Sequence, residues 1–305
     1  MRTYRIDFMA WRHVATGLSA VLVILSLIGL VFRGLNLGIE FTGGALFEVQ
    51  FRSPVALGEV RAQLADAGFN EAVVQRSGSD REILIRIPAP ETADTGSVAN
   101  DLLEVMTQVQ PEPRMVSSEV IGPAVGGELR DTAGLAALVA FGAVGLYIMF
   151  RFAGKFAVGA TAALVHDVIV TLGATIALGL TFDLSAFAAV LAIIGYSIND
   201  TIVIYDRIRE NLRLLRSATP PQAINLSLNQ TLERTLVMSA TTLFTLIALI
   251  GFGGAALRSF SVTMAVGVLV GTYSSIYVAS SLLLTMKVDR TSLLIPESVD
   301  DARQP

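Results

Sequence analysis

Cysteine is absent from this sequence, and charged residues are scarce. The lack of cysteine excludes disulfide bonds, thiol catalysis and thiolate metal sites. Asp, Glu, Lys and Arg make up 16% of the chain, against about 25% in globular proteins. Apolar residues make up 53% and the mean hydropathy is +0.63, which excludes an ordinary soluble domain. A chain of 305 residues has room for several membrane spans and one modest soluble domain.

Motifs of enzymes and of nucleic-acid-binding proteins are also missing. The glycine-rich segment "GFGGAALRS" (251–259) lacks the Lys-Ser/Thr pair of a phosphate-binding loop, and no HExxH metal motif occurs. The basic residues are scattered rather than gathered into a patch, and the net charge is −4. The sequence therefore predicts no enzyme, no cofactor or metal, and no nucleic-acid partner.

Apolar stretches of the length that crosses a membrane, about 20 residues, occur six times. The first is longer than a signal-peptide core, and no small-x-small cleavage site follows it, so it is expected to be a retained anchor. The predicted spans are about 14–32, 132–150, 156–180, 184–205, 236–252 and 260–286. The remaining segments are an N-terminus at 1–13, a polar interval at 33–131, a loop at about 206–234 and a tail at 287–305.

Lys and Arg gather beside alternate ends of these spans, which predicts their orientation. Both termini are expected in the cytoplasm, and the interval 33–131 on the opposite side of the membrane. On the other side of the membrane, short loops are expected to hold Asp183 and Arg258. The segment 206–216 is expected to be an amphipathic helix at the cytoplasmic surface. The cytoplasmic basic residues are Arg2, Arg5, Arg12, Arg151, Lys155, Arg207, Arg209, Arg213, Arg216, Lys287 and Arg290.

The interval 33–131 has the periodicity of a small globular domain. Apolar and polar residues alternate in "ALFEVQF" (45–51), which predicts a strand. A helix at 53–68, a strand pair at about 72–76 and 82–87, and a helix that begins at Ser97 follow. A strand at 114–121 completes the order β-α-β-β-α-β, which matches the ferredoxin-like motif. The predicted fold is a six-helix membrane protein with a ferredoxin-like periplasmic domain between helices 1 and 2.

Five blocks, in this order along the chain, resemble the SecF branch of the SecD/SecF protein-export membrane subunit family. The glycines and the acid of the first block, Gly38, Glu40, Gly43 and Gly44, form its signature, and Glu40 stands where the family commonly has Asp. The blocks are "GLNLGIEFTGG" (34–44), "VIGPAVGGEL" (120–129), "ALVHDV" (163–168), "AVLAIIGYSINDTIVIYDRIREN" (189–211) and "NQTLERTLVMSATTL" (229–243).

This resemblance implies half of an RND-superfamily transporter, which pairs with SecD in a twelve-span, pseudo-symmetric unit beside the SecYEG channel. The translocating polypeptide, membrane lipids and YajC are its other expected partners. The proton gradient, with no nucleotide or cofactor, is expected to drive protein export across the inner membrane.

Two other classes of function compete with this expectation. An RND-type exporter half for lipids or small molecules is the main alternative, although such exporters commonly have two repeats and two large external loops in one chain. An intramembrane hydrolase would need paired aspartates, a Ser/His pair or a metal motif. Only Asp167 and Asp200 could form such a pair, and the expected flanking motifs are missing.

Asp200 is a charged residue inside the fourth predicted span, where charge is costly and usually functional. Ser197 lies one turn before it on the same helix face and is expected to hydrogen-bond the carboxyl. Arg234 opens the fifth span. The residues alone leave two interpretations open, a proton relay or a static ion pair between Asp200 and Arg234. The family resemblance implies that both belong to the proton pathway.

Three more intramembrane polar residues are His166, Asp167 and Asn199. His166 and Asp167 are adjacent in sequence, so they are expected to point about 100° apart and not to face one partner. Histidine titrates near neutral pH, which suits a relay, but a structural hydrogen bond is an equal alternative. Asn199 is expected to bond a neighbouring helix. The sixth span carries small residues suited to close helix packing against an undetermined partner, namely Gly267, Gly271, Ser275 and Ala279.

The predicted orientation has a direct test, because the natural chain has no cysteine. A single cysteine at Ser79, in the expected hairpin, should react with an impermeant thiol reagent added from the periplasmic side. The measurement is the extent of labelling on intact inner membranes. Labelling only after the membrane is broken would contradict both the orientation and the domain assignment.

Overall fold

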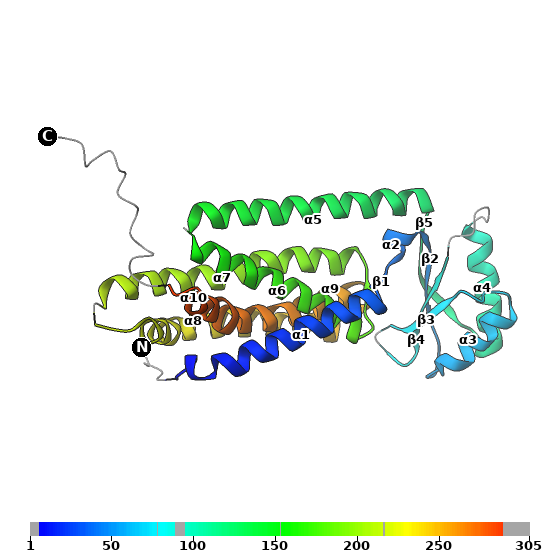
Figure 1. The fold of residues 1–305 in the computed structure, drawn as a ribbon. Helices are drawn as coiled ribbons and strands as arrows, with labels where there is room; N and C mark the ends of the chain where they lie inside the picture. Colours follow the sequence, from blue (N-terminus) through cyan, green and yellow to red (C-terminus); the bar gives the residue numbers. More distant parts are fainter. Residues whose placement is uncertain (1–5, 78, 89–94, 153, 216, 289–305) are drawn as a thin grey trace.

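The computed structural model describes residues 6–77, 79–88, 95–152, 154–215 and 217–288. Within these ranges six helices are long and apolar enough to cross a membrane. Figure 1 shows them side by side in one bundle, with an α/β unit at one end. The six helices are Met9–Phe32, which contains α1 (Arg12–Phe32), α5 (Pro123–Arg151), α6 (Lys155–Ala177), α7 (Leu184–Leu214), α8 (Pro220–Phe252) and Ala256–Thr285.

The membrane helices extend further than the apolar stretches predict. Within the segment 206–234, the helix expected over 206–216 is present as far as Leu214, as the end of α7. The part expected to be a loop is largely helical too, because α8 begins at Pro220, well before its apolar part. The start of α8 is fixed by a capping box in which Thr219 and Gln222 hydrogen-bond each other's backbone. Polar residues with high helix propensity can extend a membrane helix beyond the bilayer. Hydropathy alone therefore underestimates the length of the helix.

Of the two residues expected in loops, Asp183 lies in a connection, directly before α7, and Arg258 lies in a helix. Asp183 is the N-cap of α7, where its Oδ1 accepts a hydrogen bond from the Ala186 backbone N–H at 2.8 Å. Arg258 lies in the first turns of α9 (Gly254–Ser274), which begins the sixth span. The expectations for Arg2 and Arg5, for Arg216 and for the tail from residue 289 lie outside the described residues.

Between α1 and α5 the chain forms a four-stranded antiparallel sheet in the order β3-β4-β2-β5. One sheet face packs on two helices, and alternate residues of β2, such as Phe47 and Val49, are fully buried there. Ser97 falls inside α4 rather than at its start. The elements are β2 (Gly44–Gln50), α3 (Leu57–Asp66), β3 (Val73–Arg76), β4 (Glu82–Ile87), α4 (Thr95–Val109) and β5 (Arg114–Ile121).

The glycine-rich signature joins the α/β unit to the bundle. Its strand β1 (Asn36–Leu37) pairs in parallel with β6 (Thr181–Phe182), in the connection between α6 and α7. The short helix α2 (Ile39–Thr42) packs against the start of α5. Gly43 has a φ of +72°, and a Cβ on Gly126 would lie 2.6 Å from the Gly43 backbone nitrogen. Two distant sequence blocks therefore meet backbone to backbone, which only glycine permits.

The sixth span packs against α7 along its small residues. A Cβ on Gly267 would lie 2.1 Å from Ile193, and one on Gly271 would lie 3.1 Å from the Ser197 Cβ. The small-residue seam therefore faces α7 of the same chain. Four residues further along, the Thr201 and Ser275 hydroxyls are 2.9 Å apart. The sixth span is π-helical over Ser275–Ala279, between α9 and α10 (Ser280–Thr285), and such segments often mark functional sites.

The contact between the signature and α5 can be tested with neighbouring glycines. Gly126→Ala should destabilise the protein by about 1–3 kcal/mol, because the new methyl group meets the backbone of Gly43. Gly127→Ala is the matched control, since a Cβ at Gly127 has nothing within 4 Å. It should be neutral or stabilise by up to about 1 kcal/mol. The melting temperatures of the purified variants in detergent compare the two, and equal values would contradict the contact.

Candidate functional site: the polar centre of the helix bundle

Asp167 is the centre of a buried polar cluster where three helices meet. It lies halfway along α6, and its side chain is 0% exposed. Its Oδ2 accepts hydrogen bonds from the hydroxyls of Ser197 on α7 and Ser274 on α9, the latter at 2.7 Å. The Nδ1 of His166 lies 3.0 Å from its Oδ1. The carboxyl thus has three polar partners, which a buried carboxyl needs in the interior of a membrane protein.

The structure corrects one expectation about this cluster and adds to another. Ser197 was expected to hydrogen-bond Asp200, but its hydroxyl bonds Asp167 on the neighbouring helix. The reason is that the small-residue seam brings α7 close to α6 and α9, so that a partner across the interface is nearer. His166 and Asp167 were expected not to face one partner, and the structure adds a contact that this expectation did not include, the one between the two residues themselves. Rotation about the side-chain bonds closes the angle that separates their Cβ atoms.

Asp200 is also buried, at 2% exposed, but it lacks the partners that Asp167 has. Within the described residues its Oδ2 has no hydrogen bond. Arg234 lies exposed at the middle of α8 and, in the described part of the chain, forms no ion pair with Asp200 within 4.0 Å. Its charge nevertheless interacts with the Asp200 carboxyl at longer range. Asn199 is half-buried and has no side-chain hydrogen bond to a described residue, contrary to expectation.

Sequence reasoning missed the contribution of the sixth span. Ser274 hydrogen-bonds Asp167, and the Tyr273 ring lies 6.5 Å from the His166 ring, centroid to centroid. The Tyr273 hydroxyl donates to the Ala15 backbone oxygen of α1 at 2.7 Å. The run of polar residues in "GTYSS" (271–275), unusual in an apolar span, is the signal that could have identified this helix as a partner.

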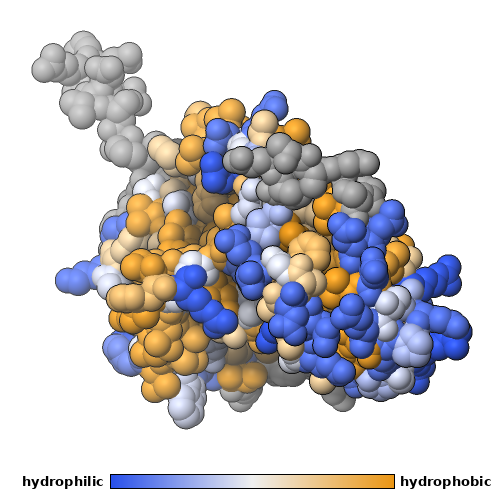
Figure 2. Space-filling view, turned by 90° about the vertical axis from the view of Figure 1, so that its right-hand side faces the viewer, coloured by the Kyte–Doolittle hydropathy of each residue, from blue (hydrophilic) through white to orange (hydrophobic). Residues whose placement is uncertain are grey.

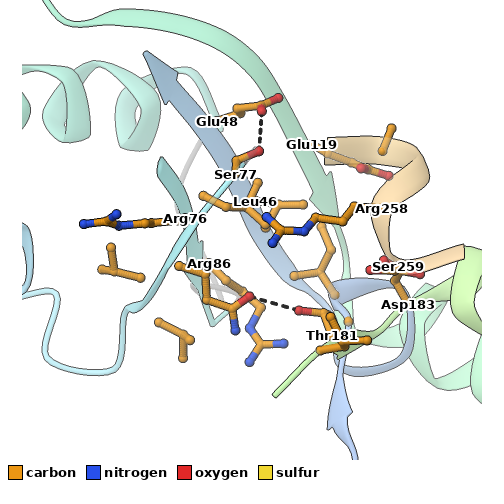
Figure 3. Close-up of a pocket in the computed structure, with 18 of the residues that line it drawn as sticks. Leu46, Glu48, Arg76, Ser77, Arg86, Glu119, Thr181, Asp183, Arg258 and Ser259 are labelled. Carbon is orange, nitrogen blue, oxygen red and sulfur yellow. Dashed lines mark hydrogen bonds between the residues drawn. The ribbon is translucent and has the colours of Figure 1, made fainter. Parts of the chain in front are cut away.

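A second polar site is a cavity of about 580 Å³ between the open face of the sheet and the end of the bundle. Figure 3 shows side chains from both parts around it, among them Glu48, Arg86, Asp183 and Arg258. Figure 2 shows that hydrophilic residues cover much of the surface at this end of the molecule. Among the described residues no group of three or more His, Cys, Asp or Glu could hold a metal ion.

Glu40 of the signature lies half-buried at this cavity. Burial raises the pKa of the Glu40 carboxyl, and the carboxylates of Asp183 and Glu119 act in the same direction. The Arg86 guanidinium donates to the Asn36 Oδ1 at 2.8 Å and to the Leu37 backbone oxygen. Burial lowers the pKa of Arg86, and the negative charge of Glu40 opposes this.

The bundle and its buried carboxyls define a polytopic helical membrane protein with ionisable groups in its interior, a feature of ion-coupled transporters. The chain matches the family described as protein export membrane protein SecD/SecF, C-terminal, over residues 101–289. It also matches the SecD/SecF GG motif over residues 28–55. The chain belongs to the SecD/SecF family.

Curated relatives carry the name protein translocase subunit SecF. The relative from Pseudomonas aeruginosa is 44% identical over 97% of this chain and 96% of its own length. The relative from Escherichia coli O157:H7 is 41% identical over 94% of this chain and 90% of its own. The crystal structure of SecDF, a translocon-associated membrane protein from Thermus thermophilus, is 39% identical with a TM-score of 0.84. It matches 93% of this chain, which spans only 39% of that longer protein.

The raised pKa of Glu40 predicts a pH-dependent stability. Its pKa in the folded state exceeds the unfolded value of 4.5, so the folded protein binds more protons between these values. Stability then falls as the pH rises through that interval. Glu40→Gln removes the buried charge, so the variant should be more stable than the natural protein above the interval. Below pH 4.5 the difference should vanish.

Melting temperatures measured between about pH 4 and pH 8 test this expectation. The same substitution at Glu59, exposed on α3, controls for the loss of one negative charge. A Glu40→Gln variant that is less stable than the natural protein at the alkaline end would contradict the argument.

Proposed function

We propose that this chain is a SecF-like subunit of a SecDF-type complex, which assists Sec-dependent protein translocation across the bacterial inner membrane. The observation that carries the proposal is the match to translocase subunits along more than nine-tenths of the chain. In this proposal the α/β unit is a ferredoxin-like periplasmic domain, and both termini lie in the cytoplasm. The strand order β3-β4-β2-β5 and the basic residues beside alternate helix ends support it.

SecD and the translocon are the proposed partners, with YajC and membrane lipids as further contacts. The outer helices of the bundle leave large apolar side chains uncovered, which suits a surface that meets lipid or a second helix bundle. On α5 these side chains are Val125, Leu135, Leu138, Val139, Leu146, Tyr147, Met149 and Phe150.

The proposed energy source is the proton gradient, and the proposed proton carrier is Asp200 with Arg234 as its charge partner. A relay carboxyl must change its protonation state, and a buried carboxyl oxygen without a hydrogen bond is suited to this. Moving one charge across 100 mV yields about 2.3 kcal/mol, enough to shift a pKa by more than one unit. The separation of Asp200 from Arg234 supports a partner that approaches during the cycle over a static pair.

Substitution of the two residues tests this proposal. Asp200→Asn should leave folding and SecD pairing intact and abolish the part of export that the gradient stimulates. Arg234→Ala should impair it as well, because Asp200 would then keep its proton throughout the cycle. The measurement is gradient-stimulated translocation into vesicles that contain the complex, with protein abundance determined alongside.

The double variant Asp200→Asn with Arg234→Met separates a relay from a structural pair. A structural pair predicts lower abundance for each single variant and recovered export for the neutral double variant. Export by this double variant with normal dependence on the gradient would show that Asp200 and Arg234 are not the proton pathway.

A further inference from the structure

His166 and Asp167 form a titratable pair that the proposed relay does not use. The pair lies near the middle of α6, about 15–18 Å from the ends of the helix at 1.5 Å per residue. Asp167 is 0% and His166 is 7% exposed. In the described part of the chain, Asp167 has no Lys or Arg within ion-pair distance. Its partners in this part of the chain are the histidine and the hydroxyls of Ser197 and Ser274.

The contacts of the pair are those of a proton-binding site rather than of simple packing. Asp167 accepts hydrogen bonds from two serine hydroxyls, and these favour its ionised form. The His166 Nε2 is buried and has no hydrogen-bond partner among the described residues. That nitrogen can take up or give up a proton without breaking an existing bond.

Ser197 links this pair to Asp200. A serine hydroxyl carries one hydrogen, and in this structure Ser197 donates it to Asp167. Asp200 lies three residues further along α7, on the same face of the helix, and its Oδ2 lacks a partner. The single hydrogen of Ser197 can stabilise the ionised form of one of these two carboxyls at a time.

Few other ionisable groups act on this site. Tyr273 of α9 is in ring contact with His166, and Tyr277 of the π-helical segment is in turn in ring contact with Tyr273. The charged residues of α1 and α5 lie at or near the ends of these helices, namely Arg12, His13, Glu128, Arg130, Asp131 and Arg151.

We propose that His166 and Asp167 form a second proton-binding site, and that Ser197 couples its occupancy to that of Asp200. When Asp167 is ionised, Ser197 donates to it and Asp200 holds the proton. When a proton enters at Asp167, that carboxyl supplies its own O–H, Ser197 turns to Asp200, and Asp200 releases its proton. One proton enters and one leaves in each step, so the charge of the centre is unchanged. This inference rests on the proposed function in that Asp200 is the proton carrier.

Infrared difference spectroscopy of the complete complex with its SecD-type partner in lipid vesicles tests the proposal directly. The signal is the carbonyl stretch of protonated carboxyls, recorded as the pH is changed. Other carboxyls such as Glu40 contribute the same signal to every variant. Asp200→Asn should keep an additional titrating carboxyl signal that is absent from Asp167→Asn combined with Asp200→Asn. Equal carboxyl signals in Asp200→Asn and in the double variant would overturn the proposal, because Asp167 would then never change its protonation.

Ser197→Ala tests the coupling without a change of volume that could prevent folding. The variant keeps the Cβ atom that packs against Gly271 and removes only the hydroxyl. The proton concentration at which each carboxyl is half-protonated should change roughly tenfold, the effect of one hydrogen bond to a charged group. Ser261→Ala is the matched control, because Ser261 is equally buried and its hydroxyl has no partner in the described part of the chain. Identical titrations of Ser197→Ala and Ser261→Ala would overturn the coupling.

The two proposals fail in different ways. Gradient-driven export that persists in Asp200→Asn would refute the proposed relay and leave the Asp167 band unaffected. An absent Asp167 band, with export abolished in Asp200→Asn, would refute the second site and leave the relay standing.

Discussion

The close packing of α7 against the sixth membrane helix is the contact on which the polar centre depends. Small residues at four-residue intervals on the sixth span meet α7, and a methyl group at Gly267 would already collide with Ile193. This proximity brings Ser197 and Ser274 to the same carboxyl oxygen of Asp167. A bulkier seam would separate the donors from the carboxyl and leave a buried acid unsatisfied, which costs several kcal/mol inside a membrane.

The same helix pair carries hydroxyl contacts beyond the cluster. Thr201 meets Ser275, and the Tyr205 hydroxyl donates to the Ala279 backbone oxygen at 2.9 Å. The Ala279 oxygen belongs to the π-helical segment, where the wider turn alters the regular backbone bonding. The seam is therefore both a packing surface and a row of polar contacts. A shift of α7 along the sixth span would break these hydrogen bonds in discrete steps rather than gradually.

At the other end of the bundle, the glycine signature connects the α/β unit to the membrane helices. Gly43 lies against α5, while β1 pairs with the connection between α6 and α7. A displacement of the α/β unit would thus act on α6, which carries Asp167, on α7, which carries Ser197, and on α5. Arg86 adds a link from the sheet to the backbone of β1. At Gly38 and Gly43 a Cβ would lie 3.0 Å from the Asp183 Cα and 2.8 Å from the Pro123 Cα, so these contacts require glycine.

Much of the architecture could be predicted from local patterns. Alternation in residues 45–51 predicts the strand β2, and the apolar stretches predict the six spans, because both depend on neighbours in sequence. The partners of Asp167 could not be predicted in this way. Ser274 is 107 residues away, and only the tertiary packing of α6 against α9 decides that it, and not a residue on α6, donates the hydrogen bond. Ser197 was assigned to Asp200 because spacing on one helix says nothing about a nearer acceptor on another.

The most direct test of this account uses the absence of cysteine in the natural chain. Thr201→Cys combined with Ser275→Cys places two thiols where the hydroxyl oxygens are 2.9 Å apart. The account predicts that a mild oxidant links them in native membranes, seen as a disulfide between α7 and the sixth span after the loop between them is cleaved. Each single variant should form no such link. Failure of the double variant to form the disulfide would contradict the seam, and with it the polar centre that the seam supports.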